Sequence, residues 1–142
     1  MSRGKKAYLQ YESELGEAIA RLSQLREELK AAIDLDAESY NAVMKAYKQA
    51  KESADADGMI DAALKLATSV PLSVAERARE VAGIAEKLKP ITNPNMKSDL
   101  TTALALARAA IEGALANVEI NLSSLKDSAF AADVRKKVAA LR

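Results

Sequence analysis

Apolar residues recur along this chain at alternating spacings of three and four, the pattern of helices that pack side by side. The longest such stripe lies within residues 93–125 and predicts a central helix from Leu100 onward. Many of its residues are Ala or Gly, so a neighbouring backbone can approach it closely. The stripe consists of Leu104, Ala107, Ile111, Ala114, Val118, Asn121 and Leu125.

Two asparagines lie on this helix. Asn117 and Asn121 are four residues apart and therefore share one face. Asn121 falls on the apolar stripe itself, where an unpaired amide costs about 1–3 kcal/mol. We therefore expect a polar group elsewhere in the protein to meet it.

The first part of the chain predicts two further helices. Apolar positions repeat every seven residues through four heptads, which predicts a helix over residues 5–32. The DLDAES cluster follows, and there Asp34 or Asp36 is a candidate N-cap for a helix that runs to about Lys51. On that second helix the carboxylate of Asp36 shares one side with two phenols, of which Tyr40 is the nearer.

The middle of the chain contains several signals that end or start helices. An acidic loop is predicted at residues 52–57, and Pro71 interrupts the apolar pattern that follows it. Ser73 and Glu76 have the spacing of a capping box. We therefore expect a kink or break near the proline and a second helical segment that ends at about Leu88.

No strand pattern appears anywhere in the sequence, so the predicted fold class is all-α. We expect a bundle of about five or six helices, two of them long, the last of which covers residues 127–141. A chain of 142 residues supports a single domain, residues 1–142, whose core is completed by dimerisation.

Composition excludes several classes of function. The chain has no His and no Cys, which excludes Ser-His-Asp triads, Cys-His dyads, disulfides and the usual zinc sites. Any general base must be Asp, Glu, Lys or Tyr. A net charge of +1 with interspersed signs indicates neither a nucleic-acid surface nor a membrane-binding face. Without a signal peptide or a long apolar run, a soluble cytoplasmic protein is expected.

Four segments then stand out together, and their order and spacing matter more than any one of them. The segments are DLDAESYNAVMKAYK (34–48), ATSVPLSVAE (67–76), NPNMKSDL (93–100) and ARAAIEGALANVEINL (107–122). Together they resemble the cyclodeaminase/cyclohydrolase family of folate enzymes over nearly the whole chain. The resemblance implies an all-helical, usually dimeric enzyme. Such an enzyme hydrolyses 5,10-methenyltetrahydrofolate to 10-formyltetrahydrofolate, or cyclises 5-formiminotetrahydrofolate and releases ammonia.

The resemblance also implies roles for particular residues. Asp36 is the candidate general base that takes a proton from water or N10, and Asp34 is its nearest competitor. Tyr40 would line the pterin pocket, and Lys48 would meet the glutamate tail or polar edge of the substrate. Further substrate contacts are expected from Asn93, Asn95, Ser98, Asp99, Asn117 and Asn121. We expect these polar patches to converge on one hollow in the folded assembly, with no metal and no cofactor besides the folate substrate.

One departure from the family leaves alternatives open. Family members carry a Gly-rich PGGGS segment and an apolar helix before the position where MSRGKK begins here. We therefore expect either an N-terminally truncated or remodelled relative, or a relative for which another polypeptide supplies that segment. The alternatives to a folate enzyme are a non-catalytic helical oligomer on the same scaffold, and a different small-molecule reaction in the same dimer cleft. We predict a homodimer or higher oligomer, because an incomplete core leaves apolar surface for a partner.

Overall fold

The computed structural model describes residues 2–51 and 55–142, and this part of the chain contains helices and turns but no strand. The α-helices are α1 (Glu12–Ala50), α2 (Ala56–Leu88), α3 (Lys97–Ser124) and α4 (Ser128–Leu141). Short 3₁₀ helices are η1 (Lys6–Tyr11), η2 (Lys89–Ile91) and η3 (Pro94–Met96). The all-α class is confirmed. The described residues form four α-helices, three of them long, instead of the predicted five or six with two long.

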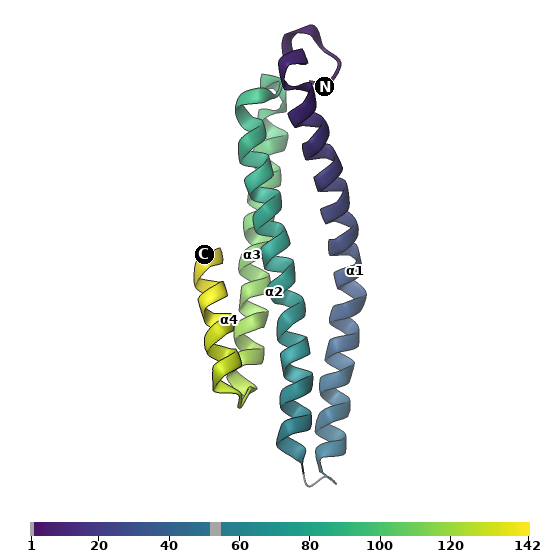
Figure 1. Cartoon of the computed structure of the whole chain (residues 1–142), viewed down its shortest axis with the longest axis vertical. Coiled ribbons are helices and arrows are strands. Elements are labelled where there is room, and N and C mark those ends of the chain that lie inside the picture. Colours follow the sequence, from purple (N-terminus) through teal and green to yellow (C-terminus); the bar gives the residue numbers. More distant parts are fainter. Residues whose placement is uncertain (1, 52–54) are drawn as a thin grey trace.

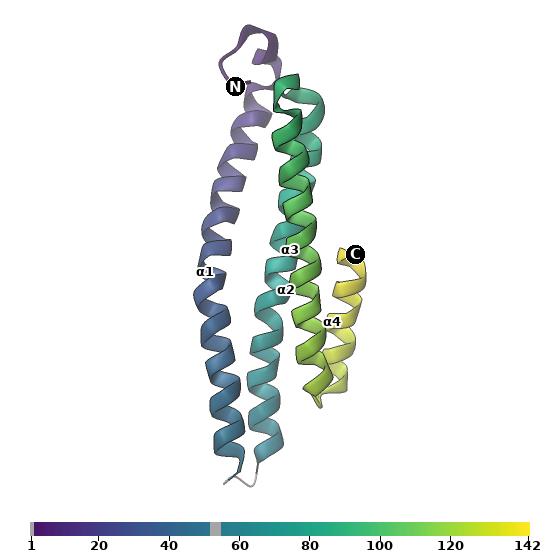
Figure 2. The ribbon, with the colours of Figure 1, turned by 180° about the vertical axis from the view of Figure 1, so that it is seen from behind.

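The three long helices lie side by side (Figure 1). α2 packs against both α1 and α3, whereas α1 and α3 make almost no contact with each other. The chain runs down α1, up α2 and down α3, and α4 lies against the lower half of α3 (Figures 1 and 2). The turn between α2 and α3 is therefore at the upper end, beside the N-terminus of the chain (Figure 1).

α1 is one continuous helix, so the prediction of two helices joined at the DLDAES cluster is wrong. Asp34 and Asp36 lie inside α1 and cap nothing. No Gly or Pro occurs after Gly16 in this helix, and an interior Asp costs at most about 0.7 kcal/mol relative to Ala. The hydroxyl of Ser39 donates a hydrogen bond to the Asp36 carbonyl at 2.9 Å, a bond made within the helix.

α2 begins at Ala56, two residues before Gly58. Asp55 is its N-cap, and the Asp55 side chain accepts a hydrogen bond from the backbone N of Gly58 at 3.3 Å. The acidic loop predicted at residues 52–57 is therefore shorter on its C-terminal side. Its residues 52–54 lie outside the described residues.

α2 also runs through Pro71 as one helix, so the break that was predicted as the alternative to a kink is wrong. Proline has no N–H, which leaves the carbonyl of Ala67, four residues earlier, without its helical donor. The side-chain amide of Asn121 on α3 supplies that donor, with its Nδ2 at 2.8 Å from the Ala67 oxygen. The Ser73 hydroxyl donates to the Val70 carbonyl at 2.7 Å, so Ser73 caps no new helix. The polar partner expected for Asn121 is thus a carbonyl that the proline has left unpaired.

The core lies where α2, α3 and α4 meet. Small residues of α2 and larger apolar residues of the other two helices form one buried cluster, which includes Ala75 of α2, Leu115 and Val118 of α3 and Val134 of α4. The stripe predicted for the long helix is buried from Leu104 through Val118. The predicted apolar stripe of α3 is therefore confirmed, but the prediction that this helix is the central one is wrong, because α2 lies between α1 and α3.

The stretch Ala56–Ile91, which is α2 with η2, is long and apolar enough to span a membrane by length and composition alone. In the folded chain this stretch lies between α1 and α3, and 39% of its most apolar window is buried. One helix of this kind is weak evidence for a membrane span, because central helices of helical bundles have the same composition.

The connection between α3 and α4 is held by Asp61 of α2. The two Asp61 carboxylate oxygens accept hydrogen bonds from the backbone N of Lys126 at 2.9 Å and of Asp127 at 2.8 Å. Asp127 is the N-cap of α4, and its side chain accepts from the backbone N of Phe130 at 3.0 Å. The short helix predicted for residues 127–141 is therefore confirmed.

Asp61→Ala should lower the free energy of unfolding by about 1–2 kcal/mol, because two backbone N–H groups at the start of α4 lose their acceptor. Asp57→Ala is the matched control. Asp57 pairs with the Lys126 side chain at 2.6 Å, but these side chains are 68% and 67% exposed, and such pairs contribute less than about 1 kcal/mol. Urea unfolding followed by circular dichroism measures both variants. Equal losses would contradict the role given to Asp61.

Candidate functional site

A groove of about 290 Å³ lies between the lower halves of α1 and α3, with α2 beneath it. Figure 2 shows α2 behind and between the other two long helices in this region. The groove is lined by Asp36, Ser39, Tyr40, Val43 and Tyr47 of α1, by Leu64, Ala67 and Pro71 of α2, and by Asn117, Ile120, Asn121 and Ser124 of α3. It therefore combines an acidic group, two phenols and two amides.

α1 presents the acidic group and the phenols. Asp36, Tyr40 and Tyr47 line the groove together because their spacings of four and seven place them on one helix face. Within the described part of the chain, the Asp36 carboxylate has neither a hydrogen-bond donor nor an ion-pair partner. Asp34 and Lys48 are exposed on α1 and lie outside the lining. Of the two candidate bases, only Asp36 reaches the groove.

α3 presents the amides. Asn117 and Asn121 are one helical turn apart, and both line the groove opposite the α1 residues. Asn117 is exposed, whereas Asn121 is half-buried and uses its Nδ2 on the Ala67 carbonyl. Asn117 thus keeps its whole amide for a ligand, and Asn121 keeps its Oδ1.

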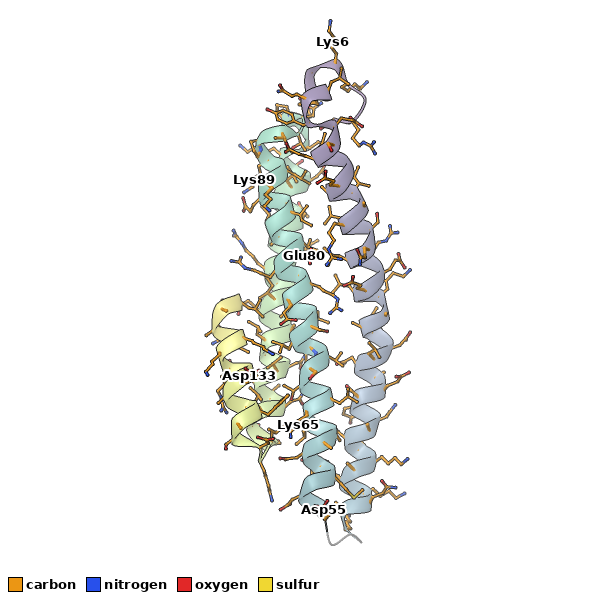
Figure 3. The ribbon with its side chains drawn as sticks, viewed as in Figure 1. Lys6, Asp55, Lys65, Glu80, Lys89 and Asp133 are labelled. Carbon is orange, nitrogen blue, oxygen red and sulfur yellow. The ribbon has the colours of Figure 1, made fainter. Side chains whose placement is uncertain are left out.

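The predicted contacts from the α2–α3 turn lie at the other end of the molecule. Figure 3 labels Lys89 near the upper end of α2 and Asp55 at its lower end, and the turn follows Lys89. Along α3 the distance from Lys97 to Asn117 is about 30 Å. Within one chain, therefore, Asn93, Asn95, Ser98 and Asp99 do not reach the groove, and two of the three polar patches come together.

The turn has a hollow of its own, of about 500 Å³, which Lys89, Asn93, Lys97 and Thr101 help to line. It is larger than the groove but contains no carboxylate, and so offers no Asp or Glu base. Asn93 is occupied there as a turn residue, since its side chain accepts from the backbone N of Asn95 at 3.0 Å. The groove at Asp36 is therefore the better candidate for chemistry. Among the described residues, no group of three or more His, Cys, Asp or Glu side chains is placed to hold a metal ion.

Some lining residues were not singled out in the sequence as site residues. Tyr47 lies seven residues after Tyr40, and Ile120 three after Asn117, so helical spacing already contained the signal for both. Leu64 and Pro71 carry no such signal. They line the groove only because α2 passes between α1 and α3.

Ion pairs between α1 and α2 lie above the groove and hold its α1 side in place. Arg21 of α1 binds Glu80 of α2 through two hydrogen bonds of 2.6 Å, and the Nε of Arg77 donates to the Oε2 of Glu28 at 2.7 Å. Figure 3 labels Glu80 in the middle of α2. The hydrogen bond from Arg77 lowers the pKa of Glu28, and the hydrogen bonds from Arg21 lower the pKa of Glu80.

Because of these pairs, stability should fall as the pH drops below 4.5, the ordinary pKa of a glutamate. A pKa lowered by folding means that the contribution is complete above that value and is lost as the pH falls through the folded-state value. Arg77→Met should flatten this dependence, whereas Arg135→Met at an exposed position of α4 should leave it unchanged. Urea midpoints between about pH 3 and pH 7 measure the effect. If the urea midpoint of Arg77→Met depended on pH as strongly as that of the wild type, the role given to these ion pairs would be contradicted.

Comparisons with known proteins agree with this arrangement. The formiminotransferase-cyclodeaminase family profile matches residues 1–140. The chain is 37% identical to methenyltetrahydrofolate cyclohydrolase of Methylorubrum extorquens, over 97% of this chain and 68% of that protein. It is 30% identical to formimidoyltransferase-cyclodeaminase of Gallus gallus, over 99% of this chain and 27% of that protein. The crystal structure of formiminotetrahydrofolate cyclodeaminase from Thermotoga maritima matches with a TM-score of 0.91 at 30% identity, over 99% of this chain and 68% of that one.

Proposed function

Since this chain belongs to the formiminotransferase-cyclodeaminase family, we propose that it is a folate enzyme that acts on the one-carbon bridge between N5 and N10 of tetrahydrofolate. The observation that supports this is the gathering of Asp36, Tyr40, Asn117 and Asn121 in one groove. Hydrolysis of 5,10-methenyltetrahydrofolate to 10-formyltetrahydrofolate is the first candidate reaction, because the cyclohydrolase relative is 37% identical and matched over 68% of its length. Cyclisation of 5-formiminotetrahydrofolate with release of ammonia is the second, favoured by the TM-score of 0.91 to a cyclodeaminase.

The chemistry of the substrate makes a single carboxylate sufficient. The bridging carbon of the methenyl compound is a cationic amidinium and is already electrophilic. The unpaired Asp36 carboxylate takes a proton from a water molecule as the water oxygen bonds to this carbon. The bond from the carbon to N5 then breaks, N5 takes a proton, and the formyl group stays on N10. One proton is released overall, and neither a metal nor a further cofactor takes part.

The other groove residues bind and orient the pterin. The rings of Tyr40 and Tyr47 offer flat apolar surfaces for it. Asn117 can donate to and accept from the amide-like edge of the pterin, and the free Oδ1 of Asn121 can accept from it. Lys48, exposed near the end of α1, attracts the negative glutamate tail from outside the groove. This placement holds the bridging carbon near Asp36.

The test is incubation of the purified chain with methenyltetrahydrofolate, followed by loss of the methenyl absorbance, and with formiminotetrahydrofolate, followed by ammonia release. Calorimetric titration with folates separates the alternatives. A non-catalytic scaffold would give neither turnover nor competition by any folate. A different reaction in the same groove would give turnover of another cyclic amidine or imine without folate binding.

A further inference from the structure

The protein itself fixes the orientation of one amide in the groove, that of Asn121. Its Nδ2 donates to the Ala67 carbonyl at 2.8 Å, because Pro71 has no N–H to give to that carbonyl. If the amide turned over, Oδ1 would lie against the carbonyl oxygen, and two hydrogen-bond acceptors in contact repel each other. Ala67 is only 7% exposed, so water would replace the lost donor poorly. The Oδ1 of Asn121 therefore points away from the Ala67 carbonyl.

Several other polar side chains that line the groove adapt to whatever a ligand offers. Within the described residues, neither Asn117 nor the phenols of Tyr40 and Tyr47 take part in a hydrogen bond. An amide that turns over exchanges its donor for its acceptor, and a hydroxyl group rotates to donate or to accept. These groups can bind a ligand, but they do not select between a donor and an acceptor.

The fixed amide of Asn121 does select, because its Oδ1 can only accept a hydrogen bond. A ligand group that lies against this oxygen must carry an N–H or an O–H. A ligand oxygen at the same place would leave two acceptors facing each other, each without the hydrogen bond that water had supplied. The groove therefore requires a donor at this point.

The proposed function determines which edge of a pterin meets this oxygen. The bridge between N5 and N10 must lie at Asp36, which α1 contributes to the groove. α3 contributes Asn121, on the opposite side. The part of the pterin farthest from the bridge carries the 2-amino group and the N3–H, and both of these are donors. That edge therefore lies toward Asn121.

We propose, on the basis of the proposed function, that Pro71 determines specificity through Asn121, by fixing its Oδ1 as the acceptor for the 2-amino edge of a reduced pterin. Pro71 is a positioning residue in this arrangement. It acts because it leaves the Ala67 carbonyl to the side chain of Asn121. The groove accordingly takes 2-amino-4-oxo pterins and rejects analogues that carry an oxygen at position 2.

The binding test compares 5-formyltetrahydrofolate with its analogue in which an oxygen replaces the 2-amino group. Calorimetric titration of the wild-type chain should show the amino compound binding about 10- to 100-fold more tightly, the range expected when an acceptor is left unpaired. In Pro71→Ala, the alanine N–H serves the Ala67 carbonyl, and the freed amide of Asn121 can turn to donate to the oxygen. The preference should therefore fall to a few-fold. An unchanged preference in Pro71→Ala would overturn the proposal.

Asn117→Ala is the matched control, because it removes an amide one helical turn away whose orientation is not fixed. It should weaken the binding of both compounds to a similar extent and keep the preference. Loss of the preference in Asn117→Ala but not in Pro71→Ala would transfer the selection to Asn117 and overturn the proposal. Circular dichroism should show Pro71→Ala as helical as the wild type, since alanine favours a helix far more than proline does.

The fixed amide is also tested without any ligand, by NMR of an isotope-labelled chain. The Nδ2 hydrogen that binds the Ala67 carbonyl should exchange with solvent more slowly than the side-chain hydrogens of Asn117. Pro71→Ala should remove this protection. Equally fast exchange at the two amides of the wild type would overturn the proposal.

The outcomes distinguish this inference from the proposed function. Tight binding of both folates without preference would overturn the role of Pro71 and leave the proposed function standing. Binding of neither compound would overturn the proposed function and, with it, the specificity inferred for the groove, even where slow exchange shows the Asn121 amide to be fixed.

Discussion

Asp36→Asn should abolish turnover of methenyltetrahydrofolate, with kcat lowered by about 10²- to 10⁴-fold, the range that removal of a general base produces. Asparagine has the size of aspartate and can hydrogen-bond to water, but it cannot take a proton. Because Asp36 is exposed in the middle of α1 and its carboxylate has no partner in the described chain, the fold should not change. Loss of methenyl absorbance under single-turnover and steady-state conditions measures the effect, and folate affinity should stay within a few-fold.

Asp34→Asn is the matched control for this variant. It makes the same chemical change on the same helix two residues earlier, at a position outside the groove. We expect its kcat to stay close to that of the wild type. Normal turnover in Asp36→Asn together with lost turnover in Asp34→Asn would transfer the base to Asp34. Normal turnover in both would remove an aspartate of this cluster from the mechanism.

The spacing of apolar residues in the sequence was sufficient to predict the buried face of a helix that packs along its whole length. The α3 stripe from Leu104 to Val118 is buried as predicted, because α2 and α4 cover one side of α3 over most of that length. The start of α4 was also predictable, since Asp127 caps its first turn through a bond within four residues. Such local signals do not depend on the rest of the fold.

Local signals failed where contacts between distant segments decide the outcome. Asp34 and Asp36 have the preference of cap residues, yet α1 continues through them because its heptad pattern packs on α2. Pro71 is a helix breaker by itself, yet α2 continues because Asn121 replaces the lost donor from 50 residues away along the chain. Neither the packing of α1 on α2 nor the hydrogen bond from Asn121 can be predicted from a short window of sequence.

In the candidate site too, local spacing predicted some features, whereas contacts between distant segments decided the others. Helical spacing placed Asp36 with Tyr40, and Asn117 with Asn121, on common faces. These two faces line opposite sides of one groove because α2 lies between α1 and α3. The spacing of residues along the sequence does not determine that arrangement. The distance of the Asn95 turn from the groove depends on the length and direction of α3.

Asn121→Leu should lower the free energy of unfolding by about 1–3 kcal/mol, the cost of leaving a buried carbonyl without a donor. Ala67, whose carbonyl loses that donor, is only 7% exposed, so water replaces the amide poorly. Asn117→Leu, an exposed position one turn earlier, is the control and should change stability by less than about 0.5 kcal/mol. Urea unfolding followed by circular dichroism gives both values.

Pro71→Ala separates this explanation from a general loss of packing, because alanine restores the backbone N–H that α2 lacks at position 71. In the Asn121→Leu background it should recover at least about 1 kcal/mol more than it does in the wild type, where the asparagine already occupies the carbonyl. Additive effects would mean that Asn121 stabilises the protein by packing alone. A positive coupling would mean that α2 passes Pro71 unbroken only while α3 lies beside it, which makes the groove and the helix that lines it depend on the same hydrogen bond.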